Sequence, residues 1–551
     1  MCFLRLLLKF RNYASSRFFI DCVNSFTRLS FLRLCYFLVF NGINLFDPRI
    51  LAVPTLIEFM NRSSIFTAVF ALLVLTIVCG VARGQDFKTD VWLEDFAQLK
   101  REISASYANL EWAVEARGLD LRQLSEQTEA RLLQAPSEVE AKKIIESFLD
   151  AFGDGHLSVR WAQSKSNNPS PAENAQPGNP APLCRRLNYQ SQNQAFRIAF
   201  NRLNDFREIN SEDSKYFSIG VLRAAGRNVG VIRIAIFSEY AFPDLCEQAA
   251  TEMKLTKDSP CDDECEELVE RKAANLLTAA LARQIEVLKR NKINALLVDI
   301  TGNGGGTNWT EAAARTLSPK SLRSPRQQFI RHEHWTMQLK RRLETIEADA
   351  RQSASPNREL LLQGADILRK AISESQKPCD RVGVWENRKP DCSLVADAPP
   401  LYPQSVLAFA KPGSLPDKPS SRFLFYPSRY AYSEGVYSGQ LMVLVDQGTW
   451  SSAEYFAAML RDNNAATIIG APTGGAGCGY TNGGIQTYLK NSRARIKIPD
   501  CVRLRADGTN EVAGITPDVL IPWRPNDSRY QRVKRVFDAL SEHINKKTKK
   551  R

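Results

Sequence analysis

Two adjacent serines stand where an apolar run gives way to a helical pattern, in the stretch DQGTWSSAEYFAAMLRDN, residues 446–463. Ser451 and Glu454 have the S-x-x-E spacing of a capping box, in which the serine begins a helix and the glutamate follows three residues later. A serine at this place also lies at the positive end of the helix, where the next backbone amide can hold an oxyanion. The local sequence is therefore compatible with a helix cap, with a nucleophile, or with both.

A serine nucleophile needs a base, and the chain has only four histidines. His156 lies in GDGHLSV, at a glycine-bearing turn that leads into a strand pattern. His332 and His334, in RHEHW, could belong to a metal site, but surface positions on a helical segment are the favoured interpretation. His543 lies in the C-terminal helix. Elimination thus favours His156 as the base.

A glycine-rich loop, TGNGGGTN, directly follows the buried strand pattern INALLVDI. Its glycines let the backbone turn sharply and present its amides. The loop lacks the lysine of a phosphate loop and does not satisfy the dinucleotide G-x-G-x-x-G pattern. The remaining alternatives are a tight turn and an oxyanion hole.

A lone carboxylate, Glu511, precedes a turn glycine in the segment GTNEVAGITPDVLIPW. Its position alone favours a solvated loop residue. The functional alternative is the carboxylate that orients the histidine of a catalytic triad.

The net charge of +13 is unevenly distributed along the 551 residues. Residues 1–84 hold nine Lys/Arg and three Asp/Glu, so they alone supply +6 of it. We find no stripe of basic residues interleaved with aromatics, so binding to nucleic acid is not expected. The length predicts two or three structural units.

The segment from Met60 onward, MNRSSIFTAVFALLVLTIVCGVARGQDF, has the layout of a secretory signal peptide over residues 60–84. The alternative is an uncleaved membrane anchor, but an apolar run of about 15 residues is short for a span of about 20. Residues 1–59 show no domain pattern, and we expect a non-native or mis-started extension. The prediction is an exported protein, periplasmic or extracellular, without stable membrane insertion after cleavage.

Eight of the twelve cysteines follow Gly84, and an even number in an exported chain allows disulfides. Cys379/Cys392 and Cys478/Cys501 are plausible local pairs. Cys261 and Cys265 resemble a metal-binding pair only weakly, because no second Cys/His pair is nearby. The other two are Cys184 and Cys246.

Strand and helix patterns alternate along the chain, which predicts an α/β fold. YFSIGVLRA and VGVIRIAIF form a hairpin pattern, residues 262–290 form an amphipathic helix, and residues 335–375 form two helices separated at Pro356. The predicted units are an N-terminal helical domain over 85–160, an irregular linker over 161–214, core segments over 215–316 and 436–540, a helical and loop insertion over 317–435, and a basic tail over 541–551.

Three of these stretches, taken in order, resemble the tail-specific (C-terminal processing) serine peptidases: LLVDITGNGGG, VLVDQGTWSSAEYFAAMLRDNNAATIIGAPTGGAG and EVAGITPDVLI. The resemblance covers roughly residues 216–310 and 436–525. It implies a crotonase/ClpP-like ββα core and a serine endopeptidase acting on protein or peptide substrates. No cofactor or metal is implied, and a homo-oligomer is compatible with it.

The chain departs from the processing peptidases where their catalytic lysine stands in TFGKG. Here the stretch is TGGAG, and Ala476 cannot take a proton. The tricorn-core-like branch uses serine, histidine and glutamate instead, and the resemblance to it implies Ser451 as nucleophile, His156 as base and Glu511 as its orienting group. The implied oxyanion hole is built from Gly304, Gly305, Gly306 and Ser452.

A second departure is Thr301, which replaces the arginine of the family's D-x-R motif. No evident PDZ module lies between residues 163 and 215. The alternative to an exported peptidase is a catalytically inactive protein of the same fold that binds peptides or an apolar ligand.

Overall fold

The computed structural model describes residues 88–161, 180–396, 398–411, 413–479, 486–524 and 526–549. The fold below is that of the compact unit Phe87–Arg551. The predicted extension, the predicted signal peptide and residues 162–179 of the predicted linker lie outside the described residues, whereas the rest of that linker contains a short helix and a strand of the central sheet. Within the described part of the chain, no helix is both long and apolar enough to cross a membrane.

A seven-stranded sheet forms the centre of this unit, in the order β12-β8-β7-β5-β4-β3-β2. The strands from β4 to β12 run parallel to their neighbours, whereas β2, β3 and β4 are antiparallel. The predicted hairpin is confirmed, because β3 and β4 are joined by Ala225 and Gly226, both with positive φ. The strands are Phe206–Ile209 (β2), Ile219–Ala224 (β3), Arg227–Arg233 (β4), Ala295–Asp299 (β5), Gln440–Val445 (β7), Thr467–Gly470 (β8) and Val519–Leu520 (β12).

Helices cover both faces of this sheet, so successive residues of its central strands enter different cores. In β5, Leu296 and Val298 pack into the core on the side of the helix α10, whereas Leu297 packs into the core that contains α16. The mixed α/β class is thereby confirmed. The first side carries Pro243–Glu252 (α9), Asp263–Arg290 (α10), Thr310–Leu317 (α11) and Ser452–Asp462 (α15), and the second carries Arg529–Lys549 (α16).

A separate core joins the N-terminal helices to a C-terminal segment that is distant in sequence. The strand β1 (Ser158–Arg160) pairs with β10 (Arg495–Lys497), which pairs with β9 (Thr487–Tyr488). The turn that carries His156 therefore lies between the last helix of this group and β1. The helices are Thr89–Ser106 (α4), Leu110–Glu115 (α5), Leu121–Leu133 (α6) and Glu138–Asp150 (α7).

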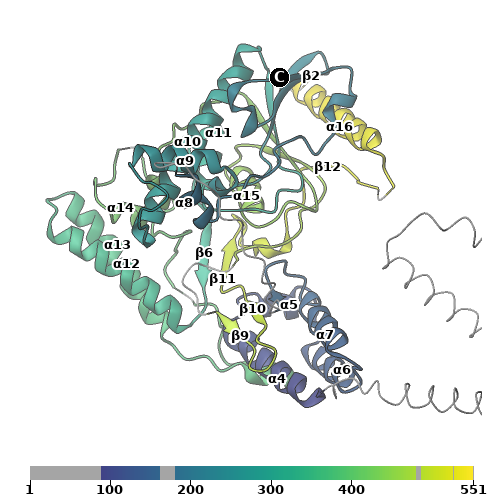
Figure 1. Cartoon of the computed structure of the whole chain (residues 1–551), viewed down its shortest axis with the longest axis vertical. Coiled ribbons are helices and arrows are strands. Elements are labelled where there is room, and N and C mark those ends of the chain that lie inside the picture. The colour runs from purple at the N-terminus through teal and green to yellow at the C-terminus, as the bar shows by residue number, and fades with distance from the viewer. Residues whose placement is uncertain are drawn as a thin grey trace, which may run out of the picture. The chain divides into compact units, whose positions relative to one another are not determined.

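A third core contains two long helices, α12 (Glu333–Arg351) and α13 (Asn357–Ser375), which lie side by side in Figure 1. The break at Pro356 confirms the predicted division of this segment. The strand β6 (Arg326–Phe329) pairs with β11 (Cys501–Leu504) and connects this core to the C-terminal part of the chain. The unit also contains two short helices, Ala181–Arg186 (α8) and Ser421–Leu424 (α14).

Four disulfides link the eight cysteines after Gly84. Cys379–Cys392 and Cys478–Cys501 confirm the predicted local pairs. Cys261 and Cys265 are bonded to each other, which excludes the weak metal-pair alternative. The remaining bond joins Cys184 in α8 to Cys246 in α9.

Candidate active site

Ser451 stands between the end of β7 and the start of α15 in a backbone conformation that is rare for a residue with a side chain. Its φ of 56° and ψ of −120° place it outside the regions that L-residues favour. Its own N–H donates to the Glu454 carboxylate at 3.0 Å, which is the glutamate half of a capping box. The turn before it is fixed by the Trp450 N–H, which donates to the carbonyl of Asn303. Ser451 is therefore held in this strained conformation by hydrogen bonds of the backbone on both sides of it.

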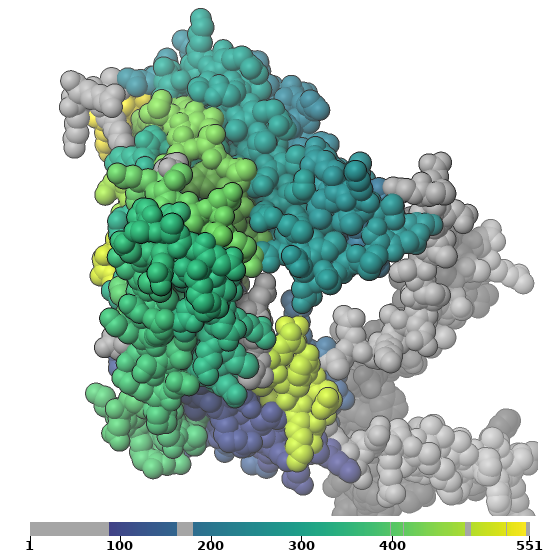
Figure 2. Space-filling view, turned by 90° about the vertical axis from the view of Figure 1, so that its left-hand side faces the viewer, coloured from purple at the N-terminus to yellow at the C-terminus, as the bar shows by residue number. Residues whose placement is uncertain are grey.

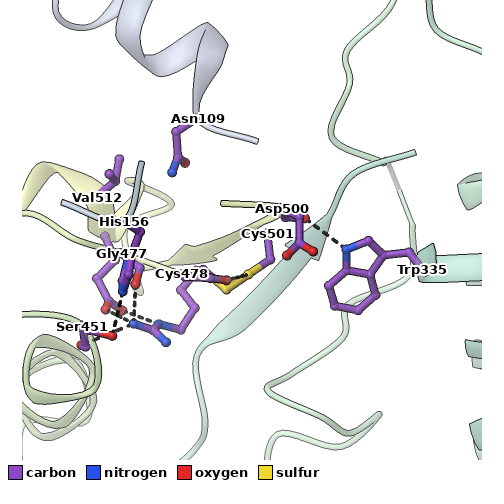
Figure 3. Close-up of a disulfide and its surroundings, with 12 residues drawn as sticks. Asn109, His156, Trp335, Ser451, Gly477, Cys478, Asp500, Cys501 and Val512 are labelled. Carbon is purple, nitrogen blue, oxygen red and sulfur yellow. Dashed lines mark hydrogen bonds and ion pairs between the residues drawn. A yellow bond between two sulfur atoms is a disulfide. The ribbon is translucent and has the colours of Figure 1, made fainter. Parts of the chain in front are cut away.

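The Ser451 hydroxyl meets the imidazole of His156, and Figure 3 shows the histidine directly above the serine. The distance from His156 Nε2 to Ser451 Oγ is 2.9 Å, although the two residues are 295 positions apart in sequence. The histidine comes from the turn after α7, and the serine comes from the central sheet. Two of the three predicted catalytic residues therefore lie within hydrogen-bond distance of each other.

The turn of His156 is fixed from behind by the buried carboxylate of Asp154. Its Oδ1 accepts the His156 N–H at 2.9 Å, and its Oδ2 accepts the Asn109 amide at 2.8 Å and the Tyr107 hydroxyl at 3.1 Å. Asn510, next to Glu511, in turn donates to Asn109. Sequence analysis missed Asp154 as a site residue, although an aspartate two residues before a turn residue is a recognisable backbone-bonding signal.

Burial, followed by the positive charges of Lys497 and Arg503, lowers the pKa of His156 to about 3, against the opposing influence of the Ala476 carbonyl. The side chain is 8% exposed. Its Nδ1 atom has no hydrogen-bond partner among the described residues. The imidazole is therefore neutral at physiological pH, as a general base must be, but its outer nitrogen is not held by a carboxylate.

Glu454 connects the serine to the loop that follows β8. Its carboxylate accepts the N–H groups of Gly475 and Ala476, both at 2.8 Å, and the Thr473 hydroxyl at 2.6 Å, in addition to the Ser451 N–H. Burial raises its pKa to about 7, and the charge of Glu511 adds to that shift. Ala476, at the position of the missing lysine, is fully buried and contributes only its backbone.

Glu511 is 1% exposed, so the interpretation as a solvated loop residue is wrong. Its carboxylate accepts two hydrogen bonds from the Arg503 guanidinium, at 2.6 Å and 3.1 Å. Arg503 also donates to the carbonyls of Gly477 and Ser451. The structure thus places Glu511 next to the site through Arg503, and no hydrogen bond joins it to His156. Arg503 lies in an ordinary strand pattern, so the sequence carries no signal for its role.

The glycine loop passes directly beneath the nucleophile. A Cβ added at Gly305 would lie 2.8 Å from Ser451 Cβ and 2.9 Å from the Ser452 nitrogen, so only glycine fits there. The Gly305 N–H itself donates to Asn303 Oδ1, and the Gly306 carbonyl accepts the Ser452 hydroxyl. Among the described residues, the Ser452 amide has no acceptor, which leaves it available to a ligand.

Thr301, which replaces the family's arginine, is fully buried and donates its hydroxyl to Asp299 at 2.7 Å. An arginine from another strand, Arg233 in β4, forms the ion pair with Asp299 at 3.3 Å. The guanidinium that braces this loop is therefore supplied from a different place in the chain.

The disulfide Cys478–Cys501 lies beside the catalytic pair, as Figure 3 shows. It ties the loop after β8 to β11, the strand that carries Arg503. The Cys501 sulfur also contacts the Gly479 carbonyl at 3.0 Å, and a Cβ added at Gly479 would lie 2.8 Å from His156 Nε2. On the far side, the indole of Trp335 donates to the carbonyl of Asp500. This disulfide therefore holds one wall of the site.

The other histidines lie in different surroundings. His334 is 3% exposed, so its predicted surface position is wrong, and its Nε2 lies 2.7 Å from an Asp500 carboxylate oxygen. Its Nδ1 contacts His332 Nδ1 at 2.8 Å. His543 belongs to α16. No cluster of three or more metal-ligating side chains occurs among the described residues.

The model of peptidase family S41 matches residues 228–521 of the chain. An uncharacterized protein of Chlamydia muridarum is 24% identical over 278 residues, which is 48% of this chain. The matched segment spans 39% of that relative's length, and a second relative, a protein of Chlamydia trachomatis, is 28% identical over 109 residues, 20% of this chain and 18% of its own length.

Solved structures of CPAF are similar to this chain in fold. A point mutant of CPAF is 16% identical with a TM-score of 0.52, and the match covers 82% of this chain and 96% of that one. Mature CPAF is 16% identical with a TM-score of 0.49, over 83% and 97% of the two chains.

Proposed function

The chain belongs to peptidase family S41, and from that premise we propose that it is a serine peptidase that cleaves peptide bonds of protein substrates. The observation that carries this proposal is the 2.9 Å contact between Ser451 Oγ and His156 Nε2. The proposed branch is the tricorn-core-like one, with a crotonase/ClpP-like core, since Ala476 stands where a Ser/Lys enzyme has its lysine.

In the proposed reaction, Ser451 Oγ attacks the scissile carbonyl while His156 Nε2 accepts the hydroxyl proton. The imidazolium then donates that proton to the leaving amine, and water hydrolyses the acyl-enzyme by the same route. The amide of Ser452, at the positive end of α15, and amides of the loop Gly304–Gly306 hold the oxyanion. The Gly305 N–H already donates to Asn303, so Gly304 and Gly306 are the glycines whose amides are proposed to take part.

Glu511 completes the proposed triad by its charge. It lies in a buried ion pair with Arg503, whose positive charge is one of those that lower the pKa of His156. A nearby carboxylate stabilises the imidazolium that His156 becomes during the reaction. Removing the Glu511 charge therefore weakens the base in this proposal.

We propose that the protein folds in an oxidising compartment outside the cytoplasm. Four disulfides link all eight cysteines of the described unit, and such density is typical of exported proteins. This agrees with the signal peptide expected over residues 60–84.

The test uses a fluorophosphonate probe and unfolded casein with the purified protein and its Ser451→Ala variant. The expected result is labelling and cleavage in the native protein, and a loss of about a thousandfold or more in the variant. Ser147→Ala, which removes a hydroxyl that bonds only within α7, is the matched control. No labelling of the natively folded protein would contradict the proposal and favour a peptide-binding role.

A further inference from the structure

One face of the small sheet next to His156 carries three cations. In the antiparallel pair β1–β10, Arg160 lies opposite Arg495, and Ser158 lies opposite Lys497. Val159 and Ile496, which alternate with them, pack into the N-terminal core. Because side chains alternate between the two faces of a strand, the three cations share the other face.

Within the described part of the chain, none of the three side chains forms a hydrogen bond or an ion pair, although the charge of Asp154 acts on Lys497. Like charges opposite each other on neighbouring strands destabilise a sheet. Burial lowers the pKa of Lys497, and Arg160 and Arg495 lower it further, whereas only Asp154 raises it. The face therefore concentrates positive charge that Asp154 offsets only in part, without an ion pair among the described residues.

This face is adjacent to the catalytic pair. Ser158 follows His156 by two residues, and Lys497 stands directly opposite Ser158. After burial, the charge of Lys497 is the largest influence that lowers the pKa of His156. In Figure 2 the segment after residue 486, in yellow-green, lies at the surface. Tyr488, 47% exposed, lies opposite Arg495 on the same face and adds an aromatic surface.

We propose that the face formed by Arg160, Arg495 and Lys497 binds a carboxylate of the polypeptide substrate close to the scissile bond. The inference deepens the proposed peptidase function and rests on it for its role in catalysis. Arginine pairs with carboxylates through two parallel hydrogen bonds, and a partly buried lysine gains from the same anion. An acidic side chain or a free carboxyl terminus would offer the same chemistry.

The test measures binding to the Ser451→Ala protein, so that it does not depend on turnover. Three short fluorescein-labelled peptides are compared by anisotropy: alternating alanine and glutamate with an amidated end, the glutamine counterpart, and that counterpart with a free carboxyl terminus. We expect the glutamate peptide to bind about fivefold or more tightly than the amidated glutamine peptide, with the preference falling as salt rises.

The discriminating variants are Arg160→Gln with Arg495→Gln, both in the Ser451→Ala background. These two substitutions together should abolish the preference for the glutamate peptide. The control Lys490→Gln removes one positive charge from the same hairpin, where Lys490 pairs with Glu94, and should retain the preference. Tight binding of the glutamine peptide with a free carboxylate would identify the chain end as the source. Equal binding of all three peptides, or a preference that survives loss of both arginines, would overturn the proposal.

Failure of this proposal and failure of the proposed function give different results. A protein that neither reacts with the fluorophosphonate nor cleaves casein, yet loses its glutamate preference with the two arginines, retains the binding face without the peptidase. A protein that cleaves casein but binds all three peptides equally retains the peptidase without the binding face.

Discussion

The two nitrogens of the His156 imidazole face very different surroundings. On the Nε2 side, Ser451 and its turn are fixed by several contacts. Glu454 accepts four hydrogen bonds, one of them from the Ser451 N–H, and Gly305 packs against the serine side chain. On the Nδ1 side, no carboxylate is hydrogen-bonded to the ring; the Ala476 carbonyl raises the pKa of His156, and Glu511 is paired with Arg503 instead.

The comparison shows that backbone hydrogen bonds fix the position of Ser451, whereas nearby charges set the pKa of His156. The nucleophile is positioned by hydrogen bonds that need no substrate. The imidazole is positioned by its turn, which Asp154 fixes, and by the residues packed around it. Its pKa depends on the charges of Lys497 and Arg503, which do not bond to the ring. We therefore expect changes at Ser451 and His156 to affect the rate directly, and changes on the Nδ1 side to act through the pKa and through stability.

The largest expected effect follows the loss of the base itself. His156→Gln keeps a polar side chain of similar reach but cannot accept the proton, so labelling by the fluorophosphonate should fall about a thousandfold or more. The measurement is the second-order labelling rate. His543→Gln on α16 is the control and should match the native rate. Native labelling in His156→Gln would mean that another group deprotonates Ser451.

Breaking the ion pair on the Nδ1 side should chiefly unfold the protein. Arg503→Met leaves the Glu511 carboxylate buried without a partner, and we expect the free energy of unfolding in urea to fall by about 3–5 kcal/mol. Adding Glu511→Gln should restore part of that loss. Lys272→Met, which breaks an exposed pair with Glu252, is the control and should lower it only slightly. Equal losses in the two single variants would contradict the importance of the buried pair.

Removing the wall disulfide should affect both stability and rate. Replacing Cys478 and Cys501 by alanine opens a link across 23 residues, and we expect about 3 kcal/mol less stability and slower labelling, because Gly479 would no longer be held against His156. Replacing Cys379 and Cys392 opens a link across 13 residues and should lower stability similarly without slowing labelling. The same labelling rate in both double variants would contradict a role for the wall.

The pH dependence tests the pKa of His156 directly. Because the folded-state pKa is lowered to about 3, the imidazole should stay neutral as the pH falls below its ordinary value of 6.5, and labelling should persist to about pH 5. Between pH 6.5 and about 3, the unfolded state binds a proton at His156 that the folded state does not. The contribution of neutral His156 to stability is therefore fully present above pH 6.5 and is lost as the pH falls toward 3. A labelling limb at pH 6.5 would contradict this prediction, and His156→Gln is the control for the stability slope.

The sequence predicts the serine side of this comparison far better than the histidine side. Ser451, Glu454 and the glycine loop lie next to strand and helix patterns, so local signals indicate both their positions and their chemistry. The central strands and the long helices were predicted for the same reason. His156 was found by elimination and by resemblance, because its contact with Ser451 depends on how distant segments pack.

The partners on the Nδ1 side have no local signature. Arg503 is one of several arginines in a strand pattern, and only the packing of β11 against the site makes it the partner of Glu511. The burial of Glu511 and His334 was missed for the same reason, since polar residues in a loop or at the start of a helix are expected at the surface when their tertiary neighbours are unknown.

The smallest expected effect measures the backbone strain on the serine side. At φ 56° and ψ −120°, glycine should tolerate position 451 better than alanine, so Ser451→Gly should unfold at a free energy about 1 kcal/mol higher than Ser451→Ala, after the entropy that glycine adds to the unfolded chain. Both variants lack the hydroxyl, so the comparison isolates the backbone. At Ser147 within α7 the order should reverse, with glycine about 1 kcal/mol less stable than alanine. If alanine were the more stable variant at both positions, the backbone at 451 would not be strained. The hydrogen bonds of Glu454 would then not be needed to hold Ser451 in its conformation.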